Sequence, residues 1–124
     1  MKIYTVEDRV KIKIGELVVS ISPLSFKQKM EIQAKINENA SEGTLLAIRH
    51  GVKKVEGVER SNGEKYELSF EDGLITDICA NDLLNMEMGG VIATACVNLI
   101  QGIPKELVHP ETGKPLEGVE ILNP

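Results

Sequence analysis

The chain has 124 residues, of which 42% are hydrophobic and 27% charged, and its formal net charge is −5. These values are typical of one soluble globular domain with its own core. An acidic chain without a basic stripe is a poor nucleic-acid binder, because phosphate contacts need clustered Lys and Arg. We also expect a cytosolic protein, because no apolar run approaches the ~18 residues of a membrane span and the charged N-terminus lacks the features of a signal peptide.

The composition predicts an aliphatic core. Aromatic residues make up 3% of the chain and Trp is absent, so Leu, Ile and Val must fill the interior. Cys79 and Cys96 fall on apolar helix faces and are expected to be free thiols. A disulfide between them is the less favoured alternative.

Residues 10–21 predict an N-terminal β-hairpin. Apolar Ile12 and Ile14 alternate with lysines, Gly15 begins the turn, and residues 17–21 are a β-rich return strand.

A first helix is expected to follow and to run to about residue 37. Ser22 is a candidate N-cap, with Pro23 at the first helical position. Ser25 is an alternative N-cap, because its spacing to Gln28 fits a capping box. The apolar arc of this helix is wide, which indicates contact with two neighbours, or with one neighbour and a partner.

Residues 52–73 predict a second, central hairpin. The Asn62-Gly63 pair is the strongest short-range hairpin signal, because both residues reach positive φ cheaply. After the turn, apolar and polar residues alternate as they do in a strand with one buried face. The apolar residues of this strand are Tyr66, Leu68 and Phe70.

Three more helices are predicted. A break at residues 39–43 precedes a short second helix, residues 75–86 form the third with Asp72 or Thr76 as its cap, and residues 91–101 form the fourth. The third helix has one apolar stripe, made of Ile75, Ile78, Cys79, Leu83 and Met86.

These elements together predict an α+β fold, with a small helical core of about four helices and two β-hairpins, one N-terminal and one central. We expect a single domain over residues 1–103. Residues 104–124 are rich in Pro and Gly and are expected to form a C-terminal arm, either a loose hairpin or an extended segment.

Catalytic patterns are lacking. The histidines, His50 and His109, have no metal-ligand spacing to a cysteine, and no glycine-rich loop follows a strand to hold a phosphate. The acidic residues do not match a calcium loop. We therefore expect no enzyme activity, no metal and no cofactor, and a binding role instead.

The order of the elements resembles that of the tail assembly chaperones of long-tailed bacteriophages. The resemblance rests on the helix that opens with Ser-Pro-Leu-Ser at residues 22–25, on the pattern I-x-x-G-V-x-x-V-E-G-V-E-R-S-N-G-E-x-Y at residues 48–66, and on the helix start at residues 74–77. It covers roughly half of the chain. Val55 is a departure, because the family commonly has a large aromatic residue at this position.

The resemblance implies a protein that acts in the host cytoplasm and is absent from the mature virion. Its implied partners are the tape-measure protein, which it keeps soluble, and the tail-tube protein, whose subunits it recruits. Because a tape measure is a long helical chain with apolar stripes, its partner needs an accessible apolar surface with a polar rim. The sequence is also compatible with a homo-oligomer.

Candidate partner-binding residues come from the excess of apolar positions over what one small core requires. They are Phe26, Met30 and Ile36 on the first helix and Leu84, Met86 and Met88 at the rim of the third. Burial of each in the protein's own core is the alternative. The competing functions are a tail-completion or head–tail connector subunit, and a small acidic inhibitor of a host protein.

Overall fold

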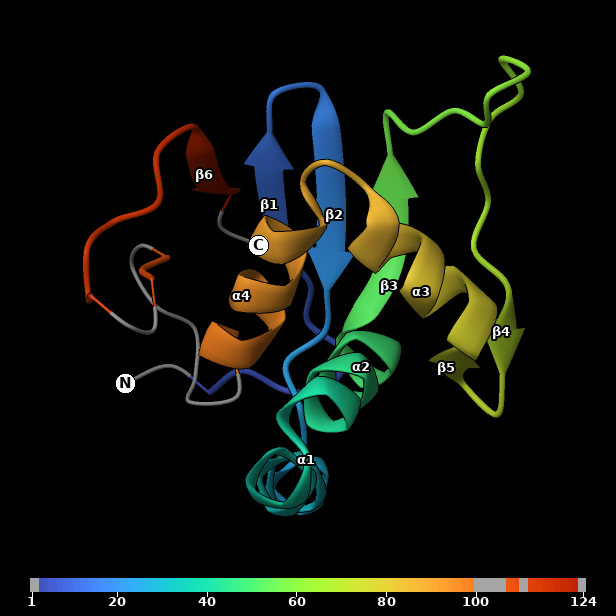
Figure 1. Cartoon of the computed structure of the whole chain (residues 1–124). Coiled ribbons are helices and arrows are strands. Elements are labelled where there is room, and N and C mark those ends of the chain that lie inside the picture. Colours follow the sequence, from blue (N-terminus) through green and yellow to red (C-terminus); the bar gives the residue numbers. More distant parts are fainter. Residues whose placement is uncertain (1–2, 100–106, 110–111, 123–124) are drawn as a thin grey trace.

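A computed structural model of the chain describes residues 3–99, 107–109 and 112–122. It confirms an α+β fold (Figure 1). The elements are β1 (Val10–Ile14), β2 (Leu17–Ile21), α1 (Phe26–Glu38), α2 (Ala40–Gly51), β3 (Val52–Glu56), β4 (Phe70–Glu71), β5 (Leu74–Ile75), α3 (Asp77–Asn85), α4 (Gly89–Leu99) and β6 (Val119–Leu122).

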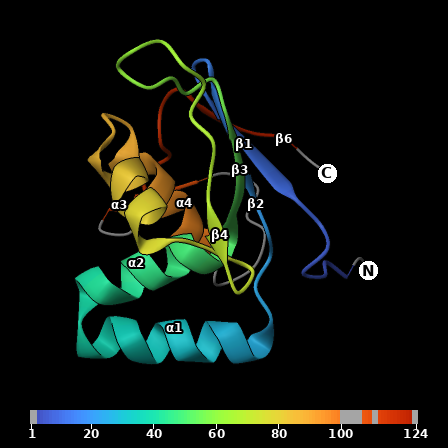
Figure 2. The same cartoon turned by 90° about the vertical axis from the view of Figure 1, so that its right-hand side faces the viewer.

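The main sheet has four antiparallel strands in the order β3-β2-β1-β6. The predicted N-terminal hairpin is confirmed: β1 pairs with β2 from Val10↔Ile21 to Ile14↔Leu17. Alternate residues of β1 are buried. Figure 2 shows α2, α3 and α4 on one side of the sheet, and none of the described helices covers the other face. The sheet therefore has one packed face and one solvated face, as is common for antiparallel sheets.

The first helix begins at Ser25 and not at Ser22. Ser25 accepts from the N–H of Gln28, whose side chain accepts from the Ser25 N–H, and this completes the capping box. The expectation that Ser22 is the N-cap is wrong, because its buried hydroxyl donates to the carbonyl of Val6 at 2.8 Å.

A single residue, Asn39, separates α1 from α2. Its N–H donates to the carbonyl of Lys35 at the end of α1, and its side chain accepts from the N–H of Glu42 in the first turn of α2. The predicted break is therefore shorter than residues 39–43. The tight corner brings Gly43 against Ile36, where a Cβ atom at Gly43 would clash with the backbone and side chain of Ile36.

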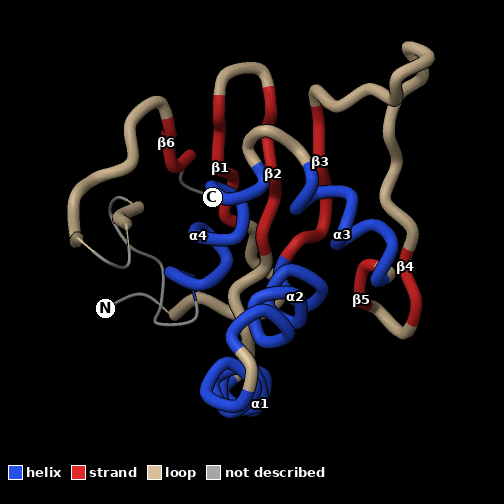
Figure 3. The backbone as a smooth tube through the Cα atoms, in the orientation of Figure 1, coloured by secondary structure: helices blue, strands red, loops and turns tan. Residues whose placement is uncertain are grey.

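The central hairpin differs from its prediction. β3 pairs with β2, so residues 52–56 belong to the main sheet and not to a separate hairpin. The predicted reversal at Asn62-Gly63 is present in a short form: the N–H of Arg60 donates to the carbonyl of Glu64 and that of Tyr66 to the carbonyl of Val58, on either side of an isolated bridge from Glu59 to Lys65. Residues 57–69 form no regular strand, however, so the predicted hairpin is much shorter than expected. The two-residue turn with positive φ at both positions lies instead at Asp72 (54°) and Gly73 (81°), between β4 and β5. Figure 3 shows the long loop between β3 and β4.

The C-terminal part agrees with expectation in one respect and differs in another. Val108 and Pro115 form an antiparallel bridge, as in the expected loose hairpin. Residues 119–122 were expected in an arm outside the domain, but as β6 they pair with β1, from Lys11↔Leu122 to Ile14↔Val119. Residues 104–106, 110–111 and 123–124 of the expected arm lie outside the described residues, as do residues 100 and 101 at the predicted end of the fourth helix.

The predicted stripe of the third helix needs two corrections. Thr76 caps α3, which begins at Asp77, so Ile75 lies in β5 and not in the helix. Ile78 is 74% exposed, because it lies about 100° from Cys79 around the helix and further from Leu83.

The core lies between the sheet and the helices and is aliphatic. Its largest fully buried side chains include Ile12, Ile21, Ile32, Ile48, Ile75, Leu83 and Ile92. Cys79 and Cys96 are buried free thiols, as predicted. Within the described residues, no helix has both the length and the apolar character needed to cross a membrane.

Candidate functional site

The predicted partner-binding residues separate into two groups. On α1, Phe26 is 76% exposed and Met30 is 50% exposed. Ile36, on the same helix, is half-buried against α2. The second group, Leu84, Met86 and Met88, is partly buried and packs against the core. The structure therefore does not bring the six residues into one exposed surface.

The exposed side chains on α1 follow from how this helix packs. Among the described elements, only α2 packs extensively against α1, and Figures 1 and 2 show α1 as the outermost helix. Ile32 is fully buried and marks the inner side of α1. At 100° per residue, Phe26, Met30 and Ala34 fall on the opposite side, and all three are exposed. We call these three residues the α1 stripe.

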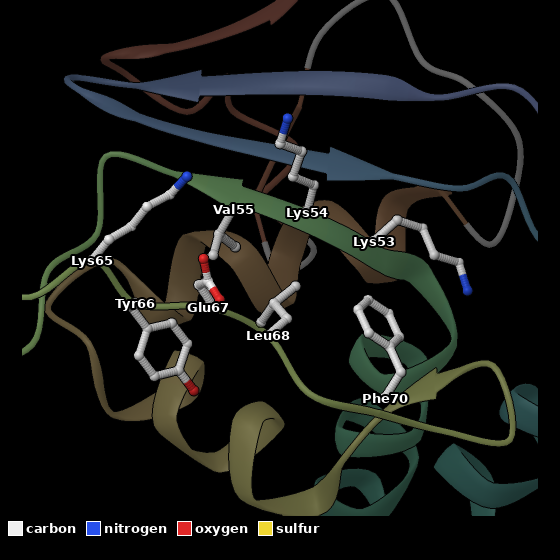
Figure 4. Close-up of a pocket in the computed structure, with 8 residues that line it drawn as sticks. All are labelled: Lys53, Lys54, Val55, Lys65, Tyr66, Glu67, Leu68 and Phe70. Carbon is white, nitrogen blue, oxygen red and sulfur yellow. The ribbon is translucent and has the colours of Figure 1, made fainter.

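A second surface feature is a depression between β3 and the extended segment at residues 65–70, with a volume of about 250 Å³ (Figure 4). Val55, Leu68 and Phe70 point into it from the two sides. The residues that line it are Lys53, Lys54, Val55, Lys65, Tyr66, Glu67, Leu68 and Phe70. Sequence reasoning missed this feature, because it placed Val55 and Leu68 in paired strands of one hairpin.

The segment beside this depression is held by contacts with α3. The hydroxyl of Tyr66 donates to Asp82 at 2.7 Å, and the N–H of Ser69 donates to the sulfur of Cys79 at 3.3 Å. Burial, together with the neighbouring Cys79 and Asp82, raises the pKa of Tyr66. Burial opposes ionisation of Cys79, but the polar groups of Thr76, Tyr66 and Ser69 around its sulfur outweigh burial and lower the pKa of this thiol. The cluster positions the segment, and no sequence pattern links its members.

His50 lies on α2 and has a buried Nδ1 atom that forms no hydrogen bond with any described residue. Its pKa is lowered, chiefly by burial and then by the charges of Lys53 and Arg49, while Glu31 on α1 acts in the opposite direction. His50 is therefore neutral at physiological pH.

The part of the chain that the structure describes holds no group of three or more His, Cys, Asp or Glu side chains placed to bind a metal ion.

Comparisons with known proteins give no relative for this chain: no protein-family model matches it, and neither does any curated protein or solved structure.

Proposed function

We propose that this chain is a non-catalytic tail assembly chaperone of a long-tailed bacteriophage. In this proposal it binds the tape-measure protein in the host cytoplasm, keeps it soluble, helps recruit tail-tube subunits around it and is absent from the finished virion. The basis is the resemblance of residues 22–25, 48–66 and 74–77 to that family, together with one feature of the fold.

That feature is the α1 stripe. Phe26 and Met30 lie one turn apart on the outer side of a helix whose main packing contact, among the described elements, is with α2 on its inner side. A partner helix with an apolar stripe of its own covers such a surface by helix-against-helix packing. Met side chains suit partners of varied sequence, because they are unbranched and adapt to irregular surfaces. The net charge of −5 supports solubility of the resulting complex.

Burial of Phe26 and Met30 against a partner would contribute substantially to the free energy of binding. Full burial of a Phe or Met side chain is worth about 1.5–3 kcal/mol. Phe26 is 76% exposed and Met30 50% exposed, so covering both contributes on the order of 2–4 kcal/mol. Their loss should weaken binding by on the order of 100-fold.

The test is co-expression with the tape-measure protein encoded by the same phage, scored by its solubility and by co-purification. Phe26→Glu combined with Met30→Glu should abolish both. Ile78→Glu combined with Val6→Glu is the matched control, because these two residues have nearly the same exposure as Phe26 and Met30, at 74% and 47% against 76% and 50%, but lie outside α1. Failure of the unmodified protein to solubilise or bind the tape measure would remove the proposed function. Equal effects of the two changes would remove the α1 stripe as its site.

A further inference from the structure

The depression between β3 and residues 65–70 is lined by no residue of α1 and is not used by the function proposed above. Its centre is apolar. Val55 is buried, Leu68 half-buried and Phe70 49% exposed. Figure 4 shows Val55 pointing from β3 toward the segment, and Leu68 and Phe70 pointing from the segment toward β3.

Lysine side chains stand at the two ends of this apolar centre. Lys65 lies at one end and Lys53 at the other (Figure 4). Within the described residues, neither has a carboxylate within 4.0 Å. Lys53 donates to the carbonyl of Gly73 at 3.1 Å, and its pKa is lowered by burial and by the charge of Arg9. The ammonium group of Lys53 is therefore partly desolvated, and a negative charge beside it would stabilise it.

Lys54 does not share this property. It forms an ion pair with Glu56 at 3.1 Å, and its side chain points away from the depression (Figure 4). Lys53 and Lys65 thus place positive charge at both ends of an apolar surface without a close ion pair among the described residues. This charge pattern is complementary to an acidic partner and not to a basic one.

The backbone around the depression favours an extended occupant. β3 is the last strand on its side of the main sheet, and none of residues 65–70 pairs with it. The volume of about 250 Å³ is below the roughly 300–1,000 Å³ of small-molecule pockets. An extended peptide presents residues i, i+2 and i+4 on one side, and so can place one apolar side chain between two carboxylates.

We infer that the depression binds an extended acidic segment of a partner protein, with an apolar side chain seated at its centre and a carboxylate at each end. The apolar side chain packs on Val55, Leu68 and Phe70. The carboxylates pair with Lys53 and Lys65. This inference is independent of the proposed function, because a different surface and a different chemistry carry it.

Glu67 provides an internal check on the inference. Its carboxylate also points toward β3 and would repel an acidic occupant. Replacing it with the uncharged Gln keeps the shape of the side chain and removes this repulsion. Glu67→Gln should therefore strengthen binding, by about twofold to fivefold for a charge at the surface.

The experiment uses the whole chain and the capped synthetic peptide acetyl-Glu-Ala-Leu-Ala-Glu-amide as the probe. Binding is followed by NMR, through the methyl signals of Val55 and Leu68, as the peptide is titrated. We expect saturable shifts that weaken as salt is added, because exposed charge pairs are screened. A second peptide with Ser in place of Leu tests the apolar contact, and a third with Lys in place of Glu tests the charge.

Charge reversal at both ends, Lys53→Glu with Lys65→Glu, should abolish the shifts. Lys27→Glu with Lys114→Glu is the matched control, because it changes the net charge equally at exposed residues that do not line the depression. The milder pair Lys53→Gln with Lys65→Gln should weaken binding while keeping the fold, which the methyl spectrum of the free protein verifies. The inference is overturned if the acidic peptide shifts neither methyl group, if the basic peptide binds as well, or if the control weakens binding as much as the reversal.

Discussion

Ile32 on α1 offers the sharpest test of how the α1 stripe is held in place. Its side chain is fully buried, and it lies on the side of α1 that faces α2. Ile32→Ala removes three carbon atoms, which is worth about 2.4 kcal/mol at ~0.8 kcal/mol per carbon. The cavity left behind raises the expected cost to about 2–4 kcal/mol. We expect the midpoint of thermal unfolding to fall by roughly 10 °C.

The loss of stability in Ile32→Ala should be largest in α1, because α1 packs mainly against α2. Amide hydrogen exchange measures this directly. The amides of α1 in the variant should open with a lower free energy, while those of β1 lose less protection. Met30→Ala is the control on the same helix, since Met30 is 50% exposed and its truncation should cost under about 1 kcal/mol. The reasoning is refuted if Ile32→Ala costs less than about 1 kcal/mol, or if α1 keeps its protection.

Three further predictions concern the contacts described above. Tyr66→Phe removes the hydroxyl that donates to Asp82 at 2.7 Å and should cost about 1–2 kcal/mol in urea unfolding. Because the folded state holds the pKa of Tyr66 above its usual value of 10.0, the stability of the unmodified protein should fall as the pH rises past this value, and Tyr66→Phe should flatten that fall. Gly43→Ala should lower the unfolding midpoint in a thermal melt, because its methyl group would push against Ile36. His50 is held neutral with a lowered pKa, so stability should decrease as the pH drops below its ordinary value of 6.5. His50→Gln should remove that part of the decrease, measured by urea unfolding on both sides of this pH.

Local signals in the sequence predicted the elements that depend on neighbours in the chain. The N-terminal hairpin follows from the alternation of apolar and polar residues before Gly15. The capping box at Ser25 is also present, and Ser25 was one of the two predicted N-caps of the first helix. In both cases the interacting residues lie within a few positions of each other. The same holds for Thr76, one of the two predicted caps of the third helix.

Pairing between distant segments was not predictable in this way. The Asn62-Gly63 signal correctly predicts a reversal with short pairing of its immediate flanks. It does not tell that Val52 and Val55, further away in the chain, join β2, where both are buried against the helices. β6 was missed for a related reason: the alternation at residues 119–122 is only four residues long, and nothing local tells which sheet edge a short strand joins.

The candidate site was predicted in part. Phe26 and Met30 were selected because the apolar arc of their helix is too wide for one neighbour, and both are exposed. The same excess of apolar positions selected Leu84, Met86 and Met88, yet these residues pack against the core. Periodicity identifies apolar positions, but it cannot tell how many neighbours cover them. The depression beside β3 depends on tertiary placement of the loop before β4, and so had no signal of its own.

The pairing of β6 with β1 has a consequence for how this protein is made. β1 leaves the ribosome well before β6, because the paired residues Lys11 and Leu122 are more than a hundred positions apart in the chain. Until then, one edge of β1 has unpaired backbone groups and can template pairing with another chain. β6 thus covers this edge of the sheet only late in synthesis. Loss of residues 119–122 would expose the edge of β1 again, and a protein proposed to keep another chain soluble would then itself tend to aggregate.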